Sequence, residues 1–294
     1  CAEAGAGAVV LKSLFEEQIE SDTQGMIGNM NVNEHADAFD FFSGMGHNYY
    51  LDDYVKLVED VKNRASIPVI ASLNCVHPGR WLEYAKRFEN VGADALELNV
   101  FVLPASVSLD GRQAEQPYFD ILAQIKRAVG IPVAMKIGCH FSGLANMLKR
   151  LSSEGADALV LFNRFYRPDV DIENLRIIPA SILSSPEEMS LSLQWIALLS
   201  GELPVDFSAT TGVHDGKGLI KQLLVGARTV QLCSTLYKNG FKQIGVMLSE
   251  LSAWMDRHSF ASIKDFNGKL CQESSNKPEL YERSQYVKAL VGIS

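Results

Sequence analysis

The sequence predicts an α/β fold, specifically a (β/α)₈ TIM barrel, on three observations. Apolar runs that are typical of parallel strands alternate regularly with amphipathic helical segments. The starts of these strands repeat two recognisable patterns along the chain. The length of 294 residues is close to that of one such barrel, so we expect a single domain.

The two kinds of strand start differ in how the preceding helix ends. In one kind a Gly-Ala turn precedes the apolar run, at residues 5–8, 92–94, 155–157 and 226–228. In the other kind an aliphatic-Pro-Val sequence opens the strand, at residues 67–69, 131–133 and 203–205. Gly and Pro both end helices, so each pattern marks a helix-to-strand boundary. The two kinds alternate, and the first strand here is of the Gly-Ala kind, so we expect a first strand and helix of the barrel that this numbering lacks.

Helical periodicity fills the intervals between the strands. It predicts helices over Leu51–Arg64, Pro78–Asn90, Tyr118–Val129, Leu144–Glu154, Leu191–Ser200, Gly216–Val225 and Phe241–His258. Residues 16–50 are too long for an ordinary loop and are rich in glycine and aromatic residues, so we expect a hairpin or lid at the mouth of the barrel. Residues 271–294 form a C-terminal tail.

Composition narrows the class of protein. Apolar residues make up 47% of the chain and charged residues 21%, as in a globular enzyme. The net charge of −8 argues against nucleic acid as the main partner, and no apolar run is long enough to span a membrane. The five cysteines are scattered and odd in number, which favours free thiols in the reducing cytoplasm. No histidine has metal-ligand spacing, so we expect no metal.

Polar side chains follow the apolar strands at the ends where barrel enzymes carry their chemistry. They are Lys12 with Ser13, Asn74 with Cys75, Asn99, Lys136 and Asn163. A lysine at the end of an apolar strand needs an anionic or polar partner, which is either a ligand or a structural ion pair. An asparagine there either binds a ligand with carbonyl and N–H edges or caps the next turn.

Residues 204–236 form a strand–helix–strand unit whose two strands end in small or hydroxyl-bearing residues. These ends are Thr210-Thr211-Gly212 and Cys233-Ser234-Thr235. Backbone N–H groups approach an anion closely only where side chains are small. The unit therefore predicts a phosphate site.

Together these motifs resemble the dihydroorotate dehydrogenase family, in particular its soluble class 1. The resemblance rests on residues 9–13, 97–99, 133–136, 212–213 and 230–232, on Asn163, and on the closing segment 262–270. It covers most of the chain.

The resemblance implies FMN as the cofactor, with its phosphate at Thr211, Gly212, Cys233 and Ser234. It places Lys136 near the pyrimidine edge of the flavin and Lys12 and Ser13 against the flavin and the substrate. It assigns Asn99 and Asn163 to substrate binding, with Asn163 also near the cofactor. It further implies oxidation of dihydroorotate to orotate in pyrimidine biosynthesis, by a homodimer.

The sequence departs from the family on the substrate side. Where the family has Ser-Cys-Pro-Asn after Glu-Leu-Asn, with the cysteine as catalytic base, this chain has Phe101-Val102-Leu103-Pro104. Val102 has no group that takes up a proton. Ser43 replaces a substrate-binding asparagine, and Ser184-Ser185 replaces a glycine pair near the flavin. Ser106 and Cys139 are weak candidates for a substitute base, and Lys12 and Lys136 are the remaining candidates for catalytic roles.

Three other functions fit parts of the pattern. A tRNA dihydrouridine synthase also uses an FMN barrel, but it needs a basic RNA-binding face and a catalytic cysteine in the loop where this chain has Val102. A non-redox enzyme acting on a sugar phosphate would share the phosphate site. A catalytically silent family member would bind flavin or a pyrimidine without turnover.

Overall fold

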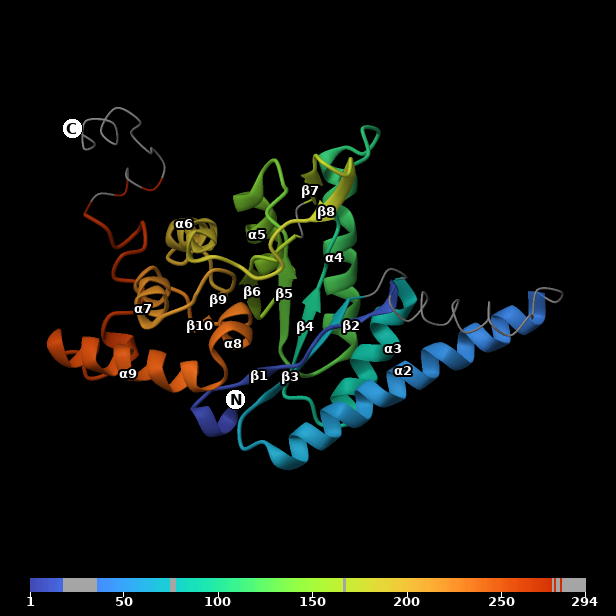
Figure 1. Cartoon of the computed structure of the whole chain (residues 1–294), viewed down its shortest axis with the longest axis horizontal. Helices are drawn as coiled ribbons and strands as arrows, with labels where there is room; N and C mark the ends of the chain where they lie inside the picture. Colours follow the sequence, from blue (N-terminus) through green and yellow to red (C-terminus); the bar gives the residue numbers. More distant parts are fainter. Residues whose placement is uncertain (18–35, 75–77, 166–167, 277, 279–280, 282–294) are drawn as a thin grey trace.

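The computed structural model describes residues 1–17, 36–74, 78–165, 168–276, 278 and 281. Its centre is a parallel sheet of strands in the order β1-β3-β4-β5-β6-β9-β10, with the short β2 also paired to β3 (Figure 1). The strands are β1 (Val9–Val10), β2 (Leu14–Phe15), β3 (Val69–Asn74), β4 (Ala95–Asn99), β5 (Val133–Ile137), β6 (Ala158–Leu161), β9 (Asp206–Ala209) and β10 (Thr229–Val230).

The sheet is curled, with helices on its outside, as in a TIM barrel. The helices are α2 (Ala36–Arg64), α3 (Pro78–Asn90), α4 (Gly111–Ala128), α5 (Leu144–Ser153), α6 (Met189–Leu199), α7 (Gly216–Leu224), α8 (Ser234–Asn239) and α9 (Lys242–Arg257). Helices α2 and α3 pack on β3, while α6 packs on β9 and α7 on β10 (Figure 1). The predicted α/β fold is confirmed. Within the described residues β1 and β10 do not pair, so the curled sheet is open between them.

Alternation along β4 shows how the strands separate the apolar core from the site. Leu96 and Leu98 are fully buried in the apolar core. Glu97 and Asn99 alternate with them, so their side chains lie on the opposite face of the sheet, where both are also buried. The polar interior of the curled sheet is therefore built from alternate positions of its strands.

Two local differences from the expected elements concern the loops. Residues 36–50, expected to lie in a hairpin or lid, instead form the first half of α2, while residues 18–35 lie outside the described part. Gly44 and Gly46 within this helix each weaken it by only about 1 kcal/mol, which does not end a helix. In addition, an antiparallel hairpin that the sequence did not suggest, β7 (Pro168–Asp171) and β8 (Arg176–Pro179), follows β6.

Candidate active site

Three of the polar strand ends lie on neighbouring strands. Asn99 at the end of β4 is directly paired in register with Lys136 on β5. The backbone N–H of Asn163, just after β6, donates to the carbonyl of Ile137 at 2.8 Å. The structure therefore brings Asn99, Lys136 and Asn163 to one mouth of the curled sheet.

Lys136 has an ion-pair partner inside this mouth. Its Nζ lies 3.3 Å from Oε1 of Glu97, whose side chain is almost fully buried. The same oxygen accepts from Ser72 Oγ at 3.3 Å, and the other oxygen accepts from Gln231 Nε2 at 2.7 Å. Lys136 thus forms a structural ion pair, which was one of the two alternatives expected from the sequence. The partner, Glu97, lies in the interior of the curled sheet.

The hydrogen-bond network continues from Ser72 to two of the predicted site residues. Ser72 Oγ and Ser13 Oγ are 2.7 Å apart, and Asn99 Nδ2 donates to Ser13 Oγ at 3.1 Å. Asn99 Oδ1 is buried and has no hydrogen-bond partner among the described residues. Lys12, next to Ser13, is exposed and forms no ion pair with a described residue.

Helix α2 supports this network from outside the sheet. The hydroxyl of Tyr54 donates to the backbone carbonyl of Ser72 and accepts from its N–H, both at 3.0 Å. Burial raises the pKa of Tyr54, and the nearby Glu97 carboxylate adds to the rise. Tyr54 therefore stays a neutral phenol that holds β3 in place.

The predicted phosphate site lies where the chain leaves β9 and β10. Ser184 Oγ accepts from the N–H of Gly212 at 3.4 Å and lies 3.1 Å from Nε2 of His214. The N–H of Ser184 donates to Ser234 Oγ at 3.0 Å, and Lys238 Nζ donates to the Ser184 carbonyl at 2.7 Å. Hydroxyls, backbone N–H groups and a cation thus converge on one small region. The two N–H groups donate within the cluster, which leaves the hydroxyls and the ammonium as donors that suit an anion.

Gly212 is required at its position for two reasons. Its φ of +79° belongs to the left-handed region that favours glycine. A Cβ on Gly212 would lie 2.3 Å from the backbone nitrogen of Met189. The missing side chain lets the segment that leads into α6 pack against the turn after β9.

His214 is held in its neutral form in this cluster. Partial burial lowers its pKa, and the positive charge of Lys238 lowers it further. Its neighbour Thr235 donates through Oγ1 to the His214 carbonyl at 3.2 Å. The ring therefore offers either one donor or one acceptor to this region at neutral pH.

The remaining predicted phosphate residues differ in how they are placed. Thr211 also has a positive φ, of 74°, and its hydroxyl donates to the carbonyl of Phe162 at 3.2 Å. Cys233 is an exposed free thiol at the start of the short helix α8, and its side chain makes no capping hydrogen bond. Ser234 is therefore better connected to the cluster than Cys233.

The loop after β4 is apolar and exposed at the position where the resemblance places a catalytic base. Phe101 is 42% and Leu103 56% exposed. The ring of Phe101 stacks on Phe165, with 3.9 Å between centroids, and His140 meets Phe165 edge-on. The N–H of Val102 donates to the hydroxyl of Tyr118 at 3.3 Å.

The candidate substitute bases lack an activating partner among the described residues. Ser106 is exposed and its hydroxyl contacts that of Ser108 at 2.8 Å. Cys139 is a half-buried free thiol. Ser43 was predicted to bind the substrate and not to act as a base. Its side chain lies outside the described part of the chain, as does Cys75.

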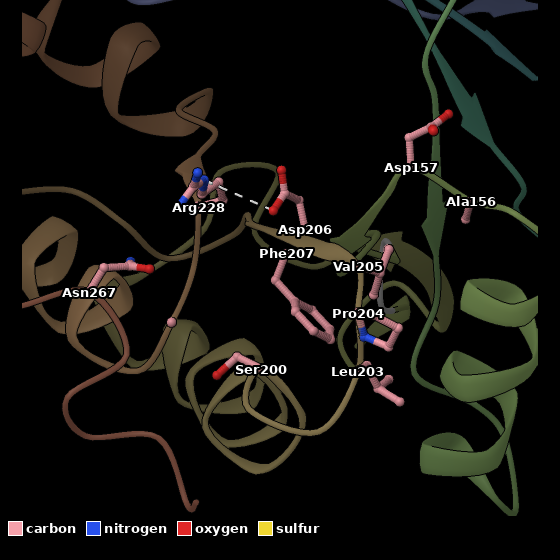
Figure 2. A pocket seen from close by; sticks show the side chains of 11 residues that line it. Ala156, Asp157, Ser200, Leu203, Pro204, Val205, Asp206, Phe207, Arg228 and Asn267 are labelled. Atoms are coloured by element: carbon pink, nitrogen blue, oxygen red, sulfur yellow. Dashed lines mark ion pairs between the residues drawn. The ribbon is translucent and has the colours of Figure 1, made fainter. Parts of the chain in front are cut away.

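A separate cavity lies at the opposite end of the strands (Figure 2). Asp157, Asp206 and Arg228 on its wall stand at or just before the amino ends of β6, β9 and β10, and the Arg228–Asp206 ion pair is 4.0 Å long. In barrel enzymes this end serves stability, and the chemistry occurs at the carboxyl ends. We therefore place the candidate site at the mouth and not in this cavity.

Several site residues escaped the sequence-based prediction. Glu97 and Ser72 were assigned to apolar strands and not to the site. Their charge or polarity at alternate strand positions could have indicated that they face the interior. Lys238 lies in a short helix and His214 in a turn, where sequence gives no orientation. Among the described residues no cluster of histidine, cysteine, aspartate or glutamate could hold a metal ion, and no helix there is long and apolar enough to cross a membrane.

The fold and the site define a class of protein: an α/β barrel-type chain whose mouth carries the Lys136–Glu97 ion pair and the amides of Asn99 and Asn163, beside a cluster of hydroxyl, N–H and ammonium groups. No known family profile matches the chain. It is 25% identical to the catalytic subunit of dihydroorotate dehydrogenase B (NAD(+)) from Thermoplasma acidophilum, over 90% of this chain and 86% of that protein. It is 26% identical to the subunit of the same name from Methanosarcina acetivorans, over 90% and 85%.

A third relative carries a different name. The putative dihydroorotate dehydrogenase A (fumarate) of Aeropyrum pernix is 24% identical over 72% of this chain and 71% of that protein. These matches confirm the resemblance to dihydroorotate dehydrogenases, and the chain is a divergent relative of that family.

Proposed function

We propose that the protein is an FMN-dependent oxidoreductase related to dihydroorotate dehydrogenase, acting on a CH–CH bond of a small substrate. The similarity to dihydroorotate dehydrogenases over nine-tenths of the chain supports the class of reaction. The observation that carries the proposal is the arrangement of one mouth, with Lys136 and Asn99 beside each other and the Ser184–Gly212–Ser234 cluster after β9 and β10.

The residues present fit FMN. The buried Asn99 Oδ1 lacks a hydrogen-bond donor among the described residues, and a flavin or substrate ring N–H would supply one. The hydroxyls of Ser184 and Ser234 and the ammonium of Lys238, which has hydrogens left beyond its bond to the Ser184 carbonyl, suit a dianionic phosphate. Thr211 and Cys233 border this cluster.

The chain's own residues would divide the chemistry as follows. FMN, when bound, supplies the hydride acceptor. Lys136 would place a positive charge near the pyrimidine edge of the bound ring system, where negative charge grows on reduction. Lys12 and Ser13 would border the flavin and the substrate, while Asn99 and Asn163 would orient the substrate through their amides.

Dihydroorotate itself fits the proposal less well than the flavin does. The position of the family's base is Val102, and neither Ser106 nor Cys139 has a partner that would activate it among the described residues. The stacked pair of Phe101 and Phe165 makes the loop side of the mouth apolar. This observation favours a second candidate, a flavoprotein of the same fold that oxidises or merely binds a less polar compound.

The test begins with the absorption spectrum of the purified protein before and after addition of FMN. A flavin spectrum that changes on binding is expected, and its absence would remove the cofactor from the proposal. Anaerobic addition of dihydroorotate then tests the substrate by bleaching of the flavin band. Bound flavin that stays oxidised would assign the protein to another substrate.

We further propose a cytoplasmic homodimer. The β7–β8 hairpin and the segment after it expose several aliphatic side chains, which favours contact with a second copy. These residues are Val170, Ile172, Leu175, Ile177 and Ile182. Light scattering after size-exclusion chromatography tests this: a dimer is expected, and a monomer at micromolar concentration would contradict it.

A further inference from the structure

We infer that Glu97 is a positioning residue that sets both the place of the Lys136 cation and the direction of the hydrogen bonds at the mouth. Glu97 is 1% exposed, yet it carries a carboxylate in the interior of the curled sheet. The effect of Glu97 on a bound flavin rests on the proposed function. The effect of Glu97 on the neighbouring side chains is independent of the proposed function.

Glu97 connects parts of the sheet that are far apart in the strand order. It lies on β4, and its carboxylate accepts from Ser72 on β3, from Lys136 on β5 and from Gln231 after β10. Gln231 is separated from it by 134 residues of sequence. One carboxylate therefore joins the two halves of the mouth across the interior.

The ion pair restricts a side chain that is otherwise highly mobile. A lysine ammonium sits at the end of a flexible four-carbon chain and binds as a point charge. Lys136 is held on the Oε1 side of Glu97, because Oε2 is taken by Gln231. The buried carboxylate in turn requires a cation, since burying it unpaired is expensive.

Glu97 also sets the direction of the hydrogen bonds at the mouth, which can be followed by counting the hydrogens of the hydroxyl groups. An ionised carboxylate only accepts hydrogen bonds, so Ser72 spends its hydroxyl hydrogen on Glu97. The 2.7 Å contact between Ser72 and Ser13 must therefore use the hydrogen of Ser13. Ser13 then has only lone pairs left for its 3.1 Å contact with Asn99.

This order of donors and acceptors fixes the orientation of the Asn99 side-chain amide. Its Nδ2 must face Ser13, so its Oδ1 is left as the buried acceptor without a described partner. The mouth consequently presents a cation at Lys136 and an acceptor at Asn99 on neighbouring strands. A ligand edge that carries a carbonyl or anionic oxygen next to an N–H is complementary to this pair.

Replacing Glu97 with glutamine tests the inference, because glutamine keeps the shape but removes the charge and adds a donor. The matched control is Glu115→Gln, which removes a carboxylate that pairs with Arg150 at 3.6 Å on the outer helices α4 and α5. The first measurement uses the protein without flavin: the rate of acetylation of Lys136 by acetic anhydride, followed by mass spectrometry. We expect a rise of about fivefold or more in Glu97→Gln and no change in the control.

The second measurement uses the flavin-loaded protein. Loss of a negative charge beside Lys136 favours the anionic reduced flavin. The equilibrium ratio of reduced to oxidised flavin should therefore rise about tenfold in Glu97→Gln. This change corresponds to a rise of about 30 mV in the two-electron reduction potential. A merely structural role would leave this potential unchanged. If Glu97→Gln does not fold, Glu97→Asp keeps the charge and shortens the reach, and intermediate acetylation is expected.

The two measurements separate the possible failures. Lys136 reactivity equal in Glu97→Gln, the control and the parent protein would overturn the inference, whatever the cofactor is. Faster acetylation without any flavin binding would uphold the role of Glu97 and refute the proposed cofactor. Faster acetylation with bound flavin but an unchanged potential would overturn the claim that Glu97 acts on the cofactor.

Discussion

The ammonium of Lys136 lies 3.3 Å from the carboxylate of Glu97, and both groups sit inside a sheet whose other face is packed with leucine and valine. Removal of one partner from a buried ion pair leaves a charge without compensation. The pair therefore contributes to folding as well as to the site.

Lys136→Met should lower the free energy of unfolding by about 3 kcal/mol, because Glu97 would keep only the neutral donors Ser72 and Gln231. Lys126→Met is the control, since its pair with Asp157 is largely exposed. That change should cost less than about 1 kcal/mol. Urea unfolding of both variants checks the difference, and equal losses would contradict the role given to the buried pair.

Gly212→Ala should destabilise the protein more than Gly92→Ala. Both glycines have φ near +80° to +90°, so both variants carry the same backbone strain, of about 1 kcal/mol or more. A Cβ at Gly92 meets nothing within 4 Å, whereas at Gly212 it meets the backbone of Met189. Thermal unfolding of the two variants measures the difference, and a Gly212 variant as stable as the Gly92 variant would refute the close packing.

Stability should fall with decreasing pH through a contribution from His214. The folded state lowers its pKa through burial and Lys238, so the unfolded chain takes up this proton first. The contribution is fully present above the ordinary histidine pKa of about 6.5 and is lost as the pH falls through the lowered value.

His214→Gln should therefore flatten the dependence of the urea midpoint on pH between about pH 5 and pH 7.5. His258→Gln, at the end of α9, is the control. An unchanged slope in the His214 variant would show that this histidine is not the group that titrates.

Val102→Cys should introduce or increase dihydroorotate-dependent reduction of bound flavin, if the rest of the substrate site matches the family. Val102 is anchored through its N–H to Tyr118, so the substitution keeps the backbone in place. Val107→Cys, fully exposed in the same loop, is the control for a nonspecific thiol effect. Stopped-flow absorbance measures the rate. No gain in Val102→Cys would show that the site has changed beyond this base.

The α/β fold could be predicted from the sequence because a Gly-Ala or Pro-Val pattern precedes every strand of the parallel sheet except the short β2. Helix α3 has the predicted bounds, and α5 and α7 each end one residue early. Helix α4 begins at Gly111 and not at Tyr118, because Asp110 and Gln113 form a capping box and Pro117 lies inside the helix. Helical periodicity predicted the start at Tyr118, while the capping box that starts the helix lies further upstream.

The site could be predicted only in part. Strand ends gave Asn99, Lys136 and Asn163, because the carboxyl ends of parallel strands necessarily meet at one edge. Glu97 was missed, since its contact with Gln231 depends on how far the sheet curls. Contacts of this kind are set by tertiary structure, and no local pattern encodes them.

The affinity for FMN compared with riboflavin tests the phosphate site at Ser184, Ser234 and Lys238, because the two flavins differ only in the phosphate. Fluorescence titration of the protein should give at least about tenfold tighter binding of FMN, since several charge-assisted hydrogen bonds are added. Ser234→Ala combined with Lys238→Ala should remove this preference, while Lys242→Ala, on the neighbouring helix α9, should keep it. Absence of flavin binding, or equal binding of both flavins by the parent protein, would show that this cluster does not bind the phosphate of FMN.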